Sequence, residues 1–272
     1  MTTAVLIQAH KNSNYILTLC KAYPDVNFYA HIDLKSEKEF FILNENKPNN
    51  LSLINNRYNV YWAGISQVKA TLSLLSLALK DKENKYFHLM SSECLPLKGF
   101  NEIELEWEQL GNINFIDRIY NSKPHMWRLR AYGLHNDTKY LRTFWGRVLS
   151  KFLKIRSFFY DSHNFKDDEK YFGSQWFSLN RDTVEYIISQ DFLYLVSRYE
   201  RVFCADEHFF QIITRDFSSY CGNKRYITWG KGANSPNYLS KSEIKKIPSE
   251  YWFARKVKQE LTIDLISERI RS

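Results

Sequence analysis

The chain has 272 residues, a formal net charge of +8 and a hydrophobic content of 44%. It is therefore long enough to bury a complete core and too hydrophobic for wholesale disorder. Nine glycines and six prolines are too few for collagen-like, linker-like or proline-rich architectures. The positive charge favours an acidic partner, which is a nucleic acid, an anionic membrane surface or a phosphorylated small molecule.

No window approaches the roughly 18 to 20 apolar residues of a membrane span. The first residues lack a basic stretch followed by a cleavage site, so we expect a cytoplasmic protein. The cysteines share no C-x-x-C spacing, which argues against a zinc knuckle or a redox pair. We expect all four to be buried thiols: Cys20, Cys94, Cys204 and Cys221.

The first half of the chain alternates strand and helix patterns. Strands are predicted over residues 3–9, 26–32 and 86–90, and helices over 12–22, from about 34, over 67–80 with Ser66 as N-cap, and near 101–110. This order is typical of an α/β fold with a mostly parallel central sheet and helices on both faces. Ligands bind such sheets at the carboxyl ends of the strands.

The pattern weakens over residues 116–170, where basic and aromatic side chains crowd together. Beyond it we predict a strand over 171–179 and a helix over 181–189 capped by Asn180. A helix with Asp206 and Glu207 in its first turn, a strand over 225–229 and a terminal helix from about Tyr251 follow. We see no linker that divides the chain, and predict one domain over residues 1–272 with 116–170 as a variable segment on the acceptor or membrane side.

Few side chains stand out as chemistry. His31 and Asp33 end a predicted strand, where an Asp can contact a ribose or cap a turn. Glu207 can act as a general base, although Asp206 and Glu207 also suit a helix start. Several cations near aromatics, among them Arg225, Arg255 and Lys256, would form an anion clamp if they converge. No Asp-x-Asp triplet for a divalent cation is present.

In order along the chain, seven segments resemble glycosyltransferase family 14, which contains the core-2 and I-branching N-acetylglucosaminyltransferases and the peptide xylosyltransferases. The segments are residues 29–36, 60–72, 86–97, 173–177, 205–210, 225–229 and 253–256. The resemblance implies a GT-A-like fold and an inverting, metal-independent transfer with no cofactor. It also implies a UDP-sugar donor, most often UDP-N-acetylglucosamine, and a saccharide or lipid-linked glycan acceptor. For this chain it suggests a bacterial relative in surface glycan synthesis.

The resemblance also assigns roles to residues of this chain. It places the catalytic base at Glu207 and the diphosphate-binding groups at Arg225, Arg255 and Lys256. The nucleotide-binding positions are His10, His31, Asp33 and Ser66. The sugar and acceptor pocket takes Trp62, Ser91, Ser92, Gly173, Ser174, Gln175, Trp176 and Asp206.

The chain departs from the family pattern at two positions. Cys94 stands where the family usually has Asp, with Glu93 one place earlier, and Ala205 replaces a common Pro. These departures leave the contact of the missing Asp open.

Two other functions fit the residues alone. One is a non-catalytic basic protein that binds nucleic acid or anionic membrane, and the other is a glycoside hydrolase that uses Glu207 with Asp33 or Asp206. For the transferase we expect no nucleic-acid partner, and we expect the basic segment 128–156 to allow peripheral contact with an anionic membrane. The sequence is silent on oligomeric state.

Overall fold

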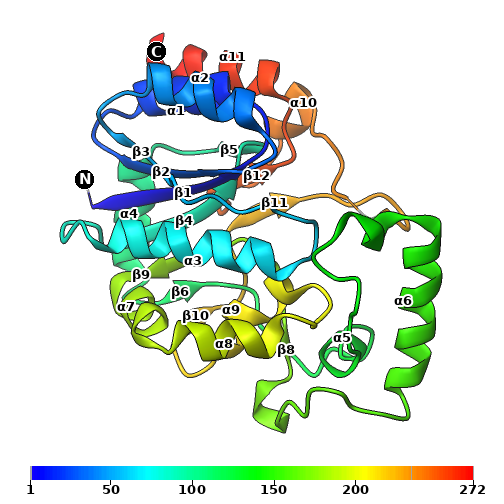
Figure 1. Cartoon of the computed structure of the whole chain (residues 1–272). Helices are drawn as coiled ribbons and strands as arrows, with labels where there is room; N and C mark the ends of the chain where they lie inside the picture. Colours follow the sequence, from blue (N-terminus) through cyan, green and yellow to red (C-terminus); the bar gives the residue numbers. More distant parts are fainter. Residues whose placement is uncertain (1, 234, 272) are drawn as a thin grey trace.

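Within residues 2–233 and 235–271, which the computed structural model describes, seven strands form the central sheet (Figure 1). The strand order is β10-β6-β9-β4-β1-β2-β3. Strands β4, β1, β2 and β3 run parallel to their neighbours in this group, and β9 runs antiparallel to β4 and β6. The strands are β1 Thr3–Ala9, β2 Asn27–Ile32, β3 Leu51–Leu53, β4 Tyr86–Ser91, β6 Asn114–Phe115, β9 Ser178–Asn180 and β10 Ser219–Tyr220.

Both faces of this sheet are covered by helices. Alternate residues of β1 enter two different cores, with Leu6 in one and Val5 and Ile7 in the other. The core around Leu6 includes residues of α3 Ile65–Leu79, α7 Arg181–Ser189, α8 Phe192–Tyr199 and α9 Phe209–Ile213. The opposite core includes residues of α1 Ser13–Ala22, α2 Glu37–Asn46, α4 Phe100–Gln109 and α11 Gln259–Arg271. The predicted α/β class, with a mostly parallel central sheet and helices on both faces, is confirmed.

A second sheet, three-stranded in the described chain, lies beside the first. Its order is β11-β12-β5, formed by β11 Arg225–Ile227, β12 Phe253–Arg255 and β5 Cys94–Pro96. Strand β12 pairs parallel with β11 and antiparallel with β5, so that Arg255 lies opposite Ile227 on one side and Cys94 on the other. Distant parts of the sequence meet here.

Several predicted boundaries are wrong. Helix α3 begins at Ile65 with Gly64 as N-cap, because the Ser66 hydroxyl donates to Asp137 instead of capping the helix. The strand expected over 171–179 is broken into two strands, β8 Tyr171–Phe172 and β9. Strand β8 pairs with β7 Ile119–Tyr120. The terminal helix starts at Gln259, since residues 253–255 pair in β12.

The strand predicted over 225–229 ends earlier, at Ile227. Three of the cysteines are buried free thiols as expected, but Cys221 is exposed, so that prediction fails for this residue.

The weakly patterned segment forms a lobe at one side of the molecule, drawn in green in Figure 1. It contains α5 Trp127–Arg130, η1 Lys139–Arg142, α6 Phe144–Ser157 and η2 Asp167–Glu169. A small core joins Ala131, Leu141 and Leu153 of this lobe to Phe203 and Ala63. The short helices η3 Ala205–Glu207 and α10 Lys241–Ile244 complete the elements. Among the described residues, we find no helix that is both long and apolar enough to cross a membrane.

Candidate active site

The candidate site lies where β1, β2 and β4 end. Because parallel strands present their carboxyl ends at one sheet edge, the residues after them, His10, Asp33 and Ser92, come together. The pKa of His10 is lowered by partial desolvation and by Lys11, and Glu93 and Asp33 act in the opposite direction. The charges of Lys11, Glu93 and Asp33 therefore act on His10, and this edge of the sheet carries a cluster of charged side chains.

Glu93 is the centre of this cluster. Its carboxylate lies 2.9 Å from the Lys11 ammonium and 3.3 Å from that of Lys256, and it accepts a hydrogen bond from Tyr238. Burial by itself would raise the pKa of Glu93, but the Tyr238 hydroxyl, Lys11 and Lys256 lower it to about 2. Two cations therefore share one carboxylate.

Arg255 stands next to this cluster at the end of β12. Its guanidinium donates to the Ser91 hydroxyl and lies 3.6 Å from the Cys94 sulfur and 4.4 Å from the centre of the Trp176 ring. Position 94 therefore lies against Arg255, and here it carries a thiol where an acidic residue would form an ion pair. Among the ion pairs of the described residues, none involves Arg255.

Arg225 differs from the sequence expectation in its surroundings. Its guanidinium is buried and donates to the main-chain carbonyls of Asn223, Phe177 and Leu89 and to the Ser178 hydroxyl. Burial lowers its pKa to about 9. The side chain ties β11 to β4 and β9, and most of its donors are already used.

Several of the predicted nucleotide-binding residues form hydrogen bonds with the main chain of neighbouring loops. Asp33 accepts from the main chain of Lys35 at 3.0 Å and pairs with its ammonium at 2.9 Å. His31 accepts from the Tyr58 amide at 2.9 Å, and burial lowers the pKa of His31 to about 4, so its ring is neutral at pH 7. Ser66 accepts from the Tyr61 amide at 2.9 Å.

The segment 173–176 lies between Arg255 and the main chain of Glu207. The Gly173 amide donates to the Glu207 carbonyl at 3.0 Å, and Trp176 lies under Arg255. Three residue steps span at most about 11 Å between the Cα atoms of Gly173 and Trp176. Arg255 and the main chain of Glu207 therefore contact the two ends of one short wall, residues 173–176. A Cβ at position 173 would overlap the Asp117 carbonyl oxygen, which explains the glycine.

The neighbouring side chains bind this wall in place. Ser174 accepts from the Trp176 amide at 3.3 Å, and Gln175 accepts from Gln67 at 3.3 Å. Gln67 also accepts from the Ala63 amide at 2.8 Å. The loop before α3 is thereby fixed, and Trp62 within it leaves 52% of its surface exposed.

Glu207 carries the accessible carboxylate of the Asp206–Glu207 pair. Its side chain is 33% exposed and forms an ion pair with Arg128 of α5. Asp206 is buried, and among the described residues its Oδ1 has no hydrogen-bond partner. Burial and the charge of Glu207 raise the pKa of Asp206 to about 8. Burial therefore disfavours the charged form of Asp206, and Glu207 is the solvent-accessible carboxylate of the pair.

Sequence reasoning missed the partners of these residues. Arg128 belonged to a basic stretch, and nothing local signals that it reaches Glu207 across 79 positions. Glu93 was noted as a departure from the family, but Lys11 and Tyr238 as its partners follow from the fold alone.

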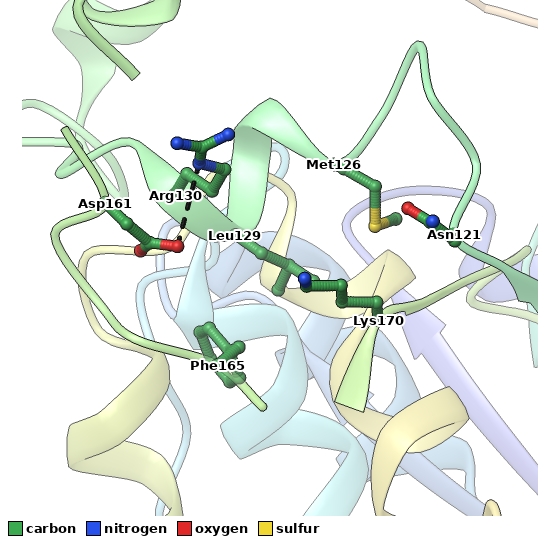
Figure 2. A pocket seen from close by; sticks show the side chains of 7 residues that line it. All are labelled: Asn121, Met126, Leu129, Arg130, Asp161, Phe165 and Lys170. Carbon is green, nitrogen blue, oxygen red and sulfur yellow. Dashed lines mark ion pairs between the residues drawn. The ribbon is translucent and has the colours of Figure 1, made fainter. Parts of the chain in front are cut away.

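Two hollows lie near these elements. A cavity of about 110 Å³ lies between α5 and the segment carrying Phe165. Arg130 and Asp161, 3.6 Å apart, lie at one end of it (Figure 2). The cavity is too small for a nucleotide sugar, since small-molecule sites measure about 300 to 1,000 Å³. A hollow of about 540 Å³ is lined by Asp117, Lys224 and Arg225 among others. Among the described residues, no group of three or more His, Cys, Asp or Glu is arranged to hold a metal ion.

The chain belongs to the core-2/I-branching enzyme family, which is glycosyltransferase family 14, because the model of that family matches residues 8–249. Over 225 residues it is 28% identical to the beta-1,3-galactosyl-O-glycosyl-glycoprotein beta-1,6-N-acetylglucosaminyltransferase 4 of Danio rerio. The match covers 78% of this chain and 49% of the relative, so the chain spans about half the length of that protein.

Similarity to solved structures is remote. Mouse xyloside xylosyltransferase 1 in its apo form aligns over 93% of this chain and 96% of its own, with 11% identity and a TM-score of 0.39. The 4-diphosphocytidyl-2C-methyl-D-erythritol synthase of Anaerococcus prevotii covers 70% of this chain and 77% of its own, with 10% identity and a TM-score of 0.32. Neither likeness bears on activity.

Proposed function

We propose that this protein is an inverting glycosyltransferase that moves a sugar, N-acetylglucosamine, from its UDP conjugate to a hydroxyl of a saccharide acceptor. Family membership supports the reaction class, and the relative in Danio rerio is named for N-acetylglucosamine transfer. The observation that carries the proposal is Arg255, a cation without a carboxylate partner in the described chain, which packs on Trp176. The same short segment, 173–176, binds the main chain of Glu207, whose carboxylate is accessible.

Glu207 is the proposed base. The acceptor oxygen attacks the anomeric carbon, its proton passes to the Glu207 carboxylate, and the bond from that carbon to the diphosphate oxygen breaks. UDP leaves with the bonding electron pair. A positioned base of this kind contributes about 10² to 10⁴ in rate. Arg128 holds the carboxylate in place before the acceptor hydroxyl arrives.

Arg255 and Lys256 are the proposed groups that neutralise the leaving diphosphate. The local count favours an anion: Lys11, Lys256 and Arg255 give three positive charges against the single carboxylate of Glu93, a net of +2. Preorganised cations stabilise charge that develops in the transition state, the task that a divalent metal performs in other transferases. Arg225 enters the proposal as a positioning residue that holds β11 against the main sheet.

The remaining assignments follow the sheet edge. His10, His31, Asp33 and Ser66 are proposed to border the uridine side. Ser91, Ser92, Trp62, Asp206 and the wall 173–176 are proposed to border the transferred sugar and the acceptor. A lipid-linked or surface glycan as acceptor, action on the cytoplasmic side of a bacterial membrane, and independence from metal complete the proposal.

The test separates binding from turnover. Isothermal titration of UDP in the presence of EDTA measures donor binding, and UDP release from UDP-N-acetylglucosamine with saccharide acceptors measures turnover. Glu207→Gln is expected to bind UDP like the wild type and to lose turnover by about 10² to 10⁴. Glu185→Gln, a surface carboxylate paired with Arg181, is the matched control.

Three results would contradict the proposal. Turnover of Glu207→Gln within tenfold of the wild type would remove the assigned base. Absence of UDP binding without added Mn²⁺ would remove the cation clamp. Cleavage of a glycan without any nucleotide would favour the hydrolase alternative instead.

A further inference from the structure

Helix α6 is attached to the protein through a narrow inner line. Of its fourteen residues, Gly146, Leu153 and Ser157 are buried. These positions are separated by seven and four residues, which places them along one side of the helix. Leu153 and the partly buried Leu149 pack in the small core with Phe203. The rest of the helix surface faces outward at the edge of the molecule (Figure 1).

The outward side of α6 is apolar. At about 100° per residue, five exposed side chains fall within an arc of about 100°, opposite the inner line. They are Phe144, Trp145, Val148, Phe152 and Ile155. Trp145 leaves 76% of its surface exposed, and the chain continues after the helix with exposed Phe158, Phe159 and Tyr160. An apolar stripe of this size on a surface marks an interaction site.

Cations surround this stripe without compensating acids. Residues 138–160 contain six basic and no acidic side chains: Lys139, Arg142, Arg147, Lys151, Lys154 and Arg156. All six are exposed, and none takes part in an ion pair within the part of the chain that the structure describes. Around the helix, Lys151, Arg147 and Lys154 flank one side of the stripe and Arg156 the other.

We propose that α6 lies in the surface of an anionic lipid bilayer, with its aromatic stripe among the acyl chains and its flanking cations at the headgroups. A helix with an apolar face and a basic rim binds in this way, buried about 5 to 10 Å deep. Long Lys and Arg side chains reach outward while their stems cover apolar surface. Trp145 suits the boundary because its ring is apolar and its indole N–H finds polar partners there.

A second copy of this chain is a less suitable occupant of the same face. Face-to-face contact would bring two sets of six unpaired cations together with no acid in the segment to offset them. An anionic bilayer supplies the missing negative charge and attracts Lys and Arg side chains near its surface.

The lobe also links this surface to the candidate active site. Helix α5 packs against α6 and carries Arg128, the partner of Glu207. Docking through α6 would therefore hold the proposed acceptor side near the membrane. The docking itself does not depend on the proposed transfer reaction, since lipid binding is measured without any nucleotide sugar.

The experiment is co-sedimentation of the full chain with vesicles of phosphatidylcholine alone or of equal parts phosphatidylcholine and phosphatidylglycerol. We expect binding to the anionic vesicles, weakened by salt, and a blue shift of Trp145 fluorescence that Trp145→Phe removes. Phe144→Ser with Phe152→Ser is expected to weaken binding by about tenfold or more. Phe41→Ser is the matched control, because Phe41 on α2 is 64% exposed and Phe152 is 61% exposed.

Phe144 and Phe152 are both exposed, so the double variant should keep the wild-type melting temperature. Failure of the wild type to bind anionic vesicles, or equal loss with Phe41→Ser, would overturn the proposal. A stable dimer in sedimentation velocity that the Phe144 and Phe152 substitutions dissolve would overturn it in favour of a second copy.

Discussion

Glu93→Gln tests the charge arrangement of the cluster formed by Lys11, Glu93 and Lys256. The substitution removes the shared partner of Lys11 and Lys256 and keeps the size of the side chain. The pKa of Glu93 is about 2, against 4.5 for an ordinary glutamate, a difference of about 2.5 units. At 1.36 kcal/mol for each unit, this corresponds to about 3 kcal/mol of unfolding free energy at neutral pH.

Two features of the site reduce that figure. Glutamine can still accept from the Tyr238 hydroxyl. The Lys11 side chain is 41% exposed, so solvent screens its share. We therefore expect Glu93→Gln to lower the unfolding free energy by about 2 kcal/mol at pH 7, and the melting temperature by roughly 4 to 8 °C. Because Lys256 loses its carboxylate, UDP should bind several-fold more tightly.

The pH dependence provides the decisive measurement. A carboxyl group whose pKa is lowered by folding stabilises the protein above its unfolded pKa, and this contribution is lost as the pH falls through the folded value. Urea unfolding of both proteins should therefore show a gap that is constant from about pH 7 to 5.5 and shrinks by about half or more at pH 3. A gap of the same size at pH 3, or none at pH 7, would refute the reasoning.

Other changes test separate parts of the site. Arg225→Met should lower the melting temperature and leave UDP affinity close to wild type. Arg255→Met should weaken UDP binding and leave the melting temperature close to wild type. Calorimetry with UDP and thermal unfolding of both variants test these outcomes. Gly173→Ala should lose transfer activity and stability together, because the new Cβ would overlap the Asp117 carbonyl. In the native protein, a thiol reagent should modify one cysteine, Cys221, and modification of a second would contradict the described burial.

The sequence predicted the sheet and most helices because their patterns are local. Strand β1 and helix α7 have the expected bounds, and Asn180 caps α7 by accepting from the Thr183 amide. The terminal helix was placed too early because residues 253–255 form a strand, and that pairing depends on β11 and β5, which are distant in sequence. Local periodicity carries no information about such partners.

For the candidate site, the sequence supplies the residue types and not their environments. A carboxylate beside another carboxylate at 206–207 gives no sign of which one is buried. The fold decides this, since Asp206 is enclosed and the Glu207 side chain is partly exposed and paired with Arg128. The same holds for Glu93, whose ion pairs join β1, β5 and β12 at points far apart in the chain.

The two arginines of the second sheet, Arg225 and Arg255, have different environments that only the fold determines. In the parallel pair of β11 and β12, Arg225 lies opposite Phe253 and Arg255 opposite Ile227. Paired residues point to the same side of a sheet, so both guanidiniums start from one face, about 6 to 7 Å apart along the strands. At the first position the neighbouring strands supply carbonyl acceptors and enclose the cation. Two residues further on, strand β4 of the main sheet ends, and Arg255 meets the hydroxyl of its last residue, Ser91, a thiol and an aromatic face. Because Arg255 has no carboxylate partner among the described residues, the end of β12 is where we propose that the diphosphate binds.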